Sequence, residues 1–199
     1  MNRNLALEFV RVTEMAAIAS ARFMGRGDEE GAFAASIEAM RCMLDSVECK
    51  ATVVIGAGGD IAESSSLKVG ETVGSGRGPQ LEIALDPLEG VEVCAMGGQN
   101  SLSVMAIADE GSLLPVPSGM YMEKIGTGPE GRGVIDILET PKENLQRLAE
   151  VKGCRVSDLT AVILDRERHF DLIDDVRAAG ARIQLIRDGD VAGAISTCL

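Results

Sequence analysis

The spacing of apolar side chains predicts two helices near the N-terminus. Over about residues 2–24, apolar residues recur every three or four positions: Leu5, Phe9, Val12 and Ala16. This is the period of one helix face. Gly25-Arg26-Gly27 should end that helix, and Asp28 is placed to cap a second one. The second helix repeats the spacing and should face the core with Phe33, Ile37, Met40 and Leu44.

Apolar and β-branched runs predict strands in the middle of the chain. The run at 52–55 indicates a short buried strand, and the glycine-rich loop 56–59 follows it. That loop could cradle a phosphate, but no Walker lysine follows, so we interpret it as a turn. Two further apolar segments, 102–108 and 112–116, are separated by a turn and predict neighbouring strands, in a hairpin.

The last third of the chain alternates between helix and strand patterns. We expect a helix at about 141–152 and then the order strand, helix, strand, helix over 161–164, 168–179, 182–187 and 190–197. A βαβα order predicts a parallel strand pair. We therefore expect an α/β fold of two domains, 1–140 and 141–199.

Composition excludes several classes of function. The formal net charge is −12, and no cluster of Lys and Arg is present to hold a nucleic-acid backbone. No run approaches the apolar length needed to span a bilayer, and no secretion signal is visible, so we expect a cytoplasmic protein. The single His and the absence of a Cys-x-x-Cys pair argue against a zinc site, and the five cysteines should be free thiols, mostly buried.

An apolar strand that runs into two carboxylates is the most informative motif. Leu81, Ile83 and Leu85 alternate as in a strand, which should end near Asp86 because Pro87 has no N–H for a sheet ladder. Asp86 and Glu89 would then converge from a turn on Mg²⁺ or Mn²⁺, which prefer oxygen ligands. The alternative is a turn-capping Asp and a solvated Glu.

The motif Asp86-Pro-Leu-Glu-Gly resembles the Asp-Pro-Ile-Glu-Gly-Thr signature of class II fructose-1,6-bisphosphatases. These are relatives of the lithium-sensitive sugar and inositol phosphatases. The similarity continues through Leu5–Glu14, Gly25–Asp28, Gly70–Gly78, Met120–Lys124 and Asp188–Ala192. It is collinear over nearly the whole chain.

The resemblance implies a layered sugar-phosphatase architecture with a mixed sheet and a C-terminal βαβα part. It implies a Mg²⁺- or Mn²⁺-dependent hydrolase of fructose 1,6-bisphosphate, with sedoheptulose bisphosphate equally open, and a homo-oligomer without nucleic-acid or membrane partners. Asp86 and Glu89 match metal ligands. The matching positions for the phosphorylated sugar are Glu89, Gly90, Val91, Tyr121, Arg166, Glu167, Arg168, Asp188, Gly189 and Asp190.

Three positions depart from the family pattern. Phe33 and Ala57 stand where the family has metal-binding carboxylates, and Val91 replaces a threonine that orients water. Asp60 and Glu63 are the candidates for the catalytic acidic pair of the same loop. The family is longer than this chain, which implies a short relative or a fragment. A second hypothesis is therefore a catalytically disabled relative that binds sugar phosphates or acts as a regulatory or structural subunit.

Two remaining features have less specific interpretations. His169 lies at the start of a predicted helix. We interpret it as a surface or substrate-adjacent residue, because the family that the chain resembles does not use histidine as a catalytic residue. The Gly74–Gly78 stretch is compatible with an anion-binding loop or with glycine punctuation before the strand that starts near residue 81.

Overall fold

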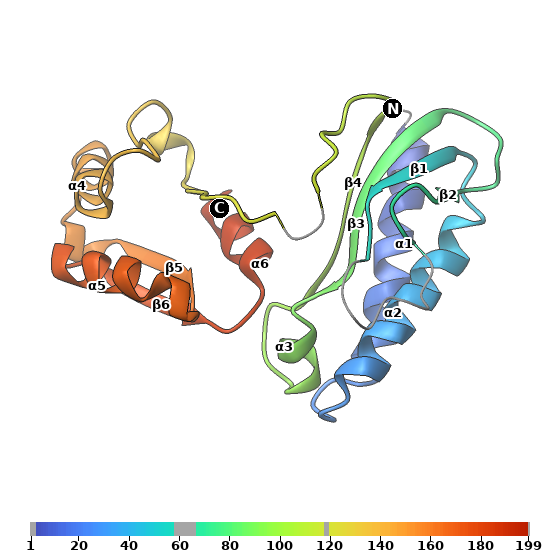
Figure 1. Ribbon diagram of the computed structural model, residues 1–199, viewed down its shortest axis with the longest axis horizontal. Helices are drawn as coiled ribbons and strands as arrows, with labels where there is room; N and C mark the ends of the chain where they lie inside the picture. The colour runs from blue at the N-terminus through green and yellow to red at the C-terminus, as the bar shows by residue number, and fades with distance from the viewer. Residues whose placement is uncertain (1–2, 58–66, 118–119, 199) are drawn as a thin grey trace. The chain divides into compact units, whose positions relative to one another are not determined.

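The computed structural model describes residues 3–57, 67–117 and 120–198 and divides the chain into two compact units (Figure 1). The first unit is Met1–Met120 and the second is Tyr121–Leu199. Asp60 and Glu63 lie outside the described residues. Within the described residues, no helix is both long and apolar enough to cross a membrane.

The first unit is a mixed sheet with two long helices on one face. Its elements are α1 (Arg3–Ala21), α2 (Glu29–Leu44), β1 (Lys50–Ile55), β2 (Thr72–Val73), β3 (Gln80–Glu89), α3 (Val91–Ala95) and β4 (Leu102–Asp109). The strand order is β2-β1-β3-β4. The central pair β1–β3 is parallel, whereas β2 and β4 run antiparallel to their neighbours. This mixed sheet confirms the expected fold class.

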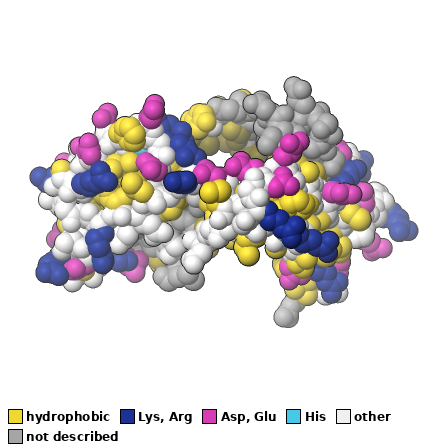
Figure 2. All heavy atoms as spheres, turned by 90° about the horizontal axis from the view of Figure 1, so that it is seen from below, with side chains coloured by type: hydrophobic (Ala, Val, Ile, Leu, Met, Phe, Trp, Pro, Cys, Tyr) yellow, Lys and Arg dark blue, Asp and Glu magenta, His cyan; other side chains and the backbone are white. Residues whose placement is uncertain are grey.

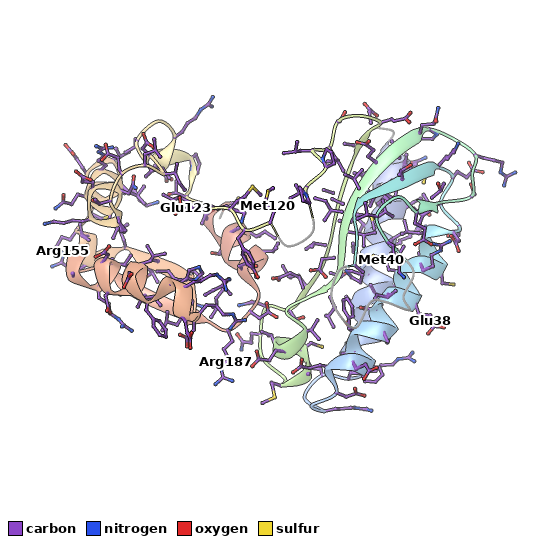
Figure 3. All side chains as sticks on the ribbon, in the orientation of Figure 1. Glu38, Met40, Met120, Glu123, Arg155 and Arg187 are labelled. Atoms are coloured by element: carbon purple, nitrogen blue, oxygen red, sulfur yellow. The ribbon has the colours of Figure 1, made fainter. Side chains whose placement is uncertain are left out.

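The core of the first unit lies between the helices and the sheet. Asp28 accepts a hydrogen bond from Gly31 N at 2.8 Å and caps α2 as predicted. On α2, Met40 points toward the sheet while Glu38 points outward (Figure 3). Every residue of the two predicted stripes except Leu5 is buried, and Leu5 packs against the same cluster. The helical periodicity therefore identified the core correctly.

Strand β3 does not end near Asp86 but continues through Pro87 to Glu89. Pro87 is tolerated because the ladder with β4 is irregular there: Asp86 pairs with Val104 and Glu89 with Leu102, with a register shift between them. On the other side, the pairing with β1 has already ended at Ala84. The missing N–H of Pro87 thus falls where the strand has no regular ladder.

The second predicted strand of the hairpin is absent. Residues 112–116 form no strand, and β4 pairs with β3 instead. The segment is fastened to the sheet by Glu82, whose carboxylate accepts a hydrogen bond from Leu113 N at 3.0 Å. Hydrogen bonds from the backbone N–H groups of Leu113 and Gly111 lower the pKa of Glu82. The segment is therefore held to the sheet by the side chain of Glu82 and not by the backbone hydrogen bonds of a strand pair.

Gly78 occupies a position that has no room for a larger residue. Its φ is +101°, and an added Cβ would lie 2.3 Å from the carbonyl oxygen of Glu48. Gly74 makes an equally close approach to the carbonyl oxygen of Cys49. Close packing against the start of β1 therefore accounts for two glycines of the Gly74–Gly78 stretch.

We expect Gly78→Ala to lower the free energy of unfolding by about 2–3 kcal/mol, because it adds a backbone clash to an unfavourable positive φ. The matched control is Gly76→Ala, which has a φ of +75° but no atom within 4 Å of the added Cβ. Urea unfolding of both variants measures the difference. Equal losses in the two variants would contradict the close approach.

The second unit contains the predicted βαβα part. Its elements are α4 (Pro141–Lys152), β5 (Thr160–Leu164), α5 (Phe170–Ala179), β6 (Arg182–Ile186) and α6 (Asp190–Ile195), with one-turn 3₁₀ helices at Pro129–Gly131, Val156–Asp158, Glu167–His169 and Ser196–Cys198. Strands β5 and β6 pair in parallel, as predicted. The last helix is shorter than expected, because its final turn is 3₁₀.

The division between the units lies before the expected boundary at residue 140. Asn144 of α4 accepts a hydrogen bond from Asp136 N at 2.8 Å and donates to the carbonyl oxygens of Asp136 and Glu139. Lys152 also forms an ion pair with Glu130 at 3.5 Å. These bonds attach the segment that precedes α4 to the second unit.

The cysteines are free, as predicted, but fewer are buried than expected. Only Cys49 and Cys94 are buried, whereas Cys42 and Cys198 are exposed. Burial raises the pKa of both Cys49 and Cys94, which keeps these thiols protonated. Cys42 lies on the solvent-facing side of α2, because the helix period places its neighbours Met40 and Leu44 in the core.

Candidate functional site

The two predicted metal ligands flank the irregularity in β3. Asp86 is partly buried and accepts a hydrogen bond from Leu88 N at 3.1 Å through Oδ1. Glu89 is only 6% exposed, and its backbone carbonyl accepts a hydrogen bond from Ser101 Oγ at 3.0 Å. Both acids belong to one strand rather than to a turn beyond it. Glu89 is buried in phase with Leu81, Ile83 and Leu85, whereas Asp86 is only partly buried.

Gly90 converts this strand end into a helix start. Its φ of +80° and ψ of +51° are left-handed, a conformation that glycine adopts without strain. The short helix α3 follows directly and is tied to the turn between α1 and α2: Gly25 N donates to Cys94 O, and Gly27 N donates to Ala95 O. Val91 packs against the hydrophobic core. The segment that carries the carboxylates is therefore held by the hydrogen bonds of α3 to the turn between α1 and α2 and by the packing of Val91 against the core.

The donor set at β3 suits a hard divalent cation. Mg²⁺ is usually held by one or two carboxylates together with substrate phosphates and water, and Asp86 and Glu89 supply two carboxylates. Among residues 3–57, 67–117 and 120–198, no group of three or more His, Cys, Asp or Glu side chains is placed to hold a metal. A metal at this site would therefore depend on ligands beyond this pair, such as substrate phosphate and water.

Phe33 and Ala57 both belong to the hydrophobic core. Phe33 is 7% exposed and Ala57 is 8% exposed, and both pack within the cluster between the helices and the sheet. The apolar residues at these positions are thus structural neighbours of Ile37 and Met40 in one buried cluster. The positions at which the resemblance implies metal-binding carboxylates are thus filled by apolar side chains of the core.

An ion pair that the sequence did not reveal holds the loop after β1. Ala57 N donates to Leu67 O at 3.2 Å, which brings together the two ends of the 58–66 segment. Glu71 accepts hydrogen bonds from the backbone N–H groups of Leu67 and Lys68 and pairs with Arg41 of α2. Leu67 is fully buried with a φ of +71°, so the carboxylate stabilises an unfavourable backbone conformation.

These contacts lower the pKa of Glu71. Burial alone would raise the pKa, but hydrogen bonds from Lys68 N and Leu67 N and the Arg41 guanidinium lower it below the ordinary value of 4.5. A lowered pKa in the folded state means that the ionised carboxylate stabilises the fold above the unfolded pKa. That contribution is lost as the pH falls through the folded pKa.

We expect Glu71→Gln to lower the free energy of unfolding by about 1–2 kcal/mol at pH 7, because charge-assisted hydrogen bonds are weakened. The difference from the wild-type chain should shrink as the pH falls below 4.5. Urea unfolding at several pH values measures it, with the outward-facing Glu38→Gln as the control. A difference that stays constant from pH 7 to pH 3 would show that the charge of Glu71 is not responsible.

The second unit gathers its predicted site residues at one edge of the β5–β6 pair. Arg166, Glu167 and Arg168 follow β5, and Asp188, Gly189 and Asp190 follow β6. The strands are parallel and in register at Leu164 and Ile186, and Asp165 N donates to Ile186 O at 2.8 Å. Both segments therefore leave the carboxyl edge of the sheet, where open α/β sheets bind ligands.

Tyr121 and Arg168 are in direct contact. The Arg168 guanidinium lies 4.9 Å from the centre of the Tyr121 ring, which is 79% exposed. A cation over an aromatic face is attracted by the ring and fixes the direction of the guanidinium. His169 Nδ1 lies 2.9 Å from the carbonyl oxygen of Leu164, so this side chain is bonded to the strand end. Arg187, which the sequence analysis did not single out, directly follows β6 (Figure 3).

Comparison with known proteins identifies the family. Residues 3–199 match the family described as "Bacterial fructose-1,6-bisphosphatase, glpX-encoded". The chain belongs to this family. It is 45% identical over 199 residues to "Fructose-1,6-bisphosphatase 1 class 2" of Escherichia coli (strain K12). It has the same identity to proteins named "Fructose-1,6-bisphosphatase class 2" from Escherichia coli O6:H1 and Shigella flexneri.

These alignments cover 100% of this chain but 59% of each relative. The class II fructose-1,6-bisphosphatase family and the α/β fold class expected from the sequence are thus confirmed. The roles of individual residues remain predictions.

Proposed function

We propose that this chain acts in the metal-dependent hydrolysis of the 1-phosphate of fructose 1,6-bisphosphate. The observation that carries the proposal is the strand end of β3, where Asp86 and the buried Glu89 flank an irregularity. The proposal is also supported by sequence similarity, because the whole chain is 45% identical to a class 2 fructose-1,6-bisphosphatase. Two oxygen donors on a rigid strand are a suitable base for a phosphate-bridging cation.

In this proposal each predicted site residue is given a role. Asp86 and Glu89 hold Mg²⁺ or Mn²⁺, which when bound polarises the phosphoryl group and activates water. Tyr121, Arg166 and Arg168 bind phosphate, with Arg168 already oriented by the Tyr121 ring, and Glu167 belongs to the same substrate-binding segment. Asp188, Gly189 and Asp190 bind sugar hydroxyls, Gly90 and Val91 line the substrate beside Glu89, and Asp60 and Glu63 supply the catalytic acids.

The test is phosphate release by the purified 199-residue chain. Fructose 1,6-bisphosphate and sedoheptulose 1,7-bisphosphate are compared with Mn²⁺, with Mg²⁺ and with EDTA. We expect release only with a divalent cation. The absence of release from either substrate with either cation would refute the proposed hydrolysis by this chain.

A second function is favoured by the burial of Phe33 and Ala57. Because these apolar residues fill the core, a chain that binds sugar phosphates without hydrolysing them would still fold normally. Such a chain would serve as a regulatory or structural subunit. Calorimetric binding of fructose 1,6-bisphosphate without turnover would support this function. The absence of both sugar-phosphate binding and association with an active relative would exclude it.

Assembly and location complete the proposal. We propose that the chain forms a homo-oligomer and works in the cytoplasm on a phosphorylated sugar. The net charge of −12 and the lack of a cluster of basic residues in the sequence support a small-molecule partner rather than a nucleic acid. Sedimentation and cell fractionation test these two points separately.

A further inference from the structure

The side chain of His169 is bonded to the last residue of β5. Its Nδ1 lies 2.9 Å from the carbonyl oxygen of Leu164, and the residue is partly buried at the start of α5. A carbonyl oxygen can only accept a hydrogen bond, so Nδ1 must carry the proton. In the neutral ring, Nε2 is then the nitrogen without a proton. His169 is therefore a donor to the backbone through Nδ1.

This bond closes the turn that joins β5 to α5. Within the turn, Arg166 N donates to Leu164 O at 3.0 Å, and His169 N donates to Arg166 O at 2.8 Å. The Nδ1–H of His169 is a second donor to the same oxygen of Leu164. It ties the end of the turn directly to the end of the strand. The backbone of residues 165–168 is thus enclosed between two bonded residues, Leu164 and His169.

The enclosed turn carries two guanidinium groups without carboxylate partners. Arg166 donates through Nη1 to the carbonyl oxygen of Asp165 at 3.2 Å, and Arg168 lies over the Tyr121 ring. Among the described residues, neither arginine forms an ion pair with Asp or Glu. Yet the chain has 31 Asp and Glu against 19 Lys and Arg. Acidic side chains also lie among basic ones on the face that Figure 2 shows. Two unpaired guanidinium groups in one turn of such an acidic chain suit an anionic ligand.

We propose that His169 is a positioning residue of this turn. The inference rests on the proposed binding of phosphate by Arg166 and Arg168. The imidazole does not touch the ligand: its bond to Leu164 O holds the backbone of the turn, and thereby the two guanidinium groups, in the arrangement that the phosphate meets. Side chains that are ordered before binding lose less conformational entropy when the ligand arrives. Substrate affinity should therefore depend on the Nδ1 bond, whereas the rate of hydrolysis of bound substrate should not.

The first test measures the KM and kcat of phosphate release with Mn²⁺, and the Kd of fructose 1,6-bisphosphate by calorimetry in EDTA. His169→Ala should raise KM and Kd by about tenfold and change kcat by less than about twofold. His169→Asn is the conservative variant. Its amide nitrogen is as many bonds from Cα as Nδ1, so it keeps a donor for Leu164 O and should bind almost as tightly as the wild-type chain. The amide nitrogen of His169→Gln matches Nε2 instead, so this variant should resemble His169→Ala.

The outcomes of the first test separate the inference from the proposed function. Equal KM and Kd in the wild-type chain and in His169→Ala would overturn the inference and leave the proposed function intact. Affinity kept by His169→Gln but lost in His169→Asn would overturn it as well, because Nε2 would then be the nitrogen that matters. A fall in kcat at unchanged KM would overturn it by assigning His169 to the chemical step. A wild-type chain that neither binds nor hydrolyses the bisphosphate would refute the proposed function and the inference with it.

The second test distinguishes positioning from a general loss of structure. In a chain with Arg166→Ala and Arg168→Ala, His169→Ala should leave the residual KM unchanged, because the side chains through which it acts are gone. His169 is the single histidine of the chain, so the nitrogen chemical shifts of its ring can be assigned directly, and they should place the proton on Nδ1. An undiminished effect of His169→Ala in the arginine-free turn would overturn the inference. A neutral ring with its proton on Nε2 would also overturn it.

Discussion

Asp86→Asn should reduce the rate of phosphate release from fructose 1,6-bisphosphate by at least about 100-fold. The substitution keeps the size of the side chain and an oxygen that can accept the hydrogen bond from Leu88 N, so the strand end should be preserved. It removes one of two carboxylates proposed to hold the cation, and loss of such electrostatic stabilisation commonly costs 10²-fold or more.

The matched control is Asp109→Asn, at the exposed end of β4 in the same sheet. It should retain wild-type activity. Titration of Mn²⁺ followed by electron paramagnetic resonance gives a readout apart from turnover, and Asp86→Asn should bind the ion more weakly than Asp109→Asn. Equal activity and equal Mn²⁺ affinity in the two variants would remove Asp86 from the proposed metal site.

Phe33→Asp should destabilise the first unit by at least about 3 kcal/mol, even though the family resemblance implies a metal-binding carboxylate at this position. Removing a buried phenylalanine costs about 3–5 kcal/mol, and an uncompensated carboxylate adds a desolvation penalty. Phe33 is 7% exposed and packs among Ile37, Met40 and the other core residues of the cluster. Restoring the family residue alone should therefore not restore a metal centre.

Urea unfolding with and without Mn²⁺ measures this effect, with Phe33→Leu as the control, which should cost less than about 1.5 kcal/mol because its volume and polarity are similar. We expect Mn²⁺ to leave the stability of Phe33→Asp unchanged. Stabilisation by Mn²⁺ in Phe33→Asp but not in Phe33→Leu would show that the new carboxylate reaches a cation. In that case the triple variant Phe33→Asp, Ala57→Glu, Val91→Thr becomes the test for recovered hydrolysis.

Local patterns predicted the helices of this fold well. The stripe of Phe33, Ile37, Met40 and Leu44 placed α2, and α4 has the bounds expected from its sequence. Both predictions depend on a period of 3.6 residues and on caps, which are encoded within a few neighbouring positions. The parallel pairing of β5 and β6 followed from element order in the same way.

Features that depend on distant partners could not be predicted. The rule that proline ends a strand failed at Pro87, because only the pairing with β4 shows that the ladder is irregular there. The Arg41–Glu71 pair joins residues 30 positions apart, and no spacing rule connects them. At the candidate site, the sequence identified Asp86 and Glu89, but the alternative of a solvated Glu89 could be set aside only by its burial in the structure. The contact of Tyr121 with Arg168 likewise required the structure.

The bonds of Asn144 have a consequence for how the second unit could be inherited as a module. Because Asn144 holds the backbone at Asp136 and Glu139, the irregular segment before α4 is part of the folded unit. A gene fusion that carried only the regular helices and strands would leave the amide of Asn144, which is 8% exposed, without its acceptors. Recombination that exchanges this module intact should therefore cut near Tyr121, well before its first α-helix.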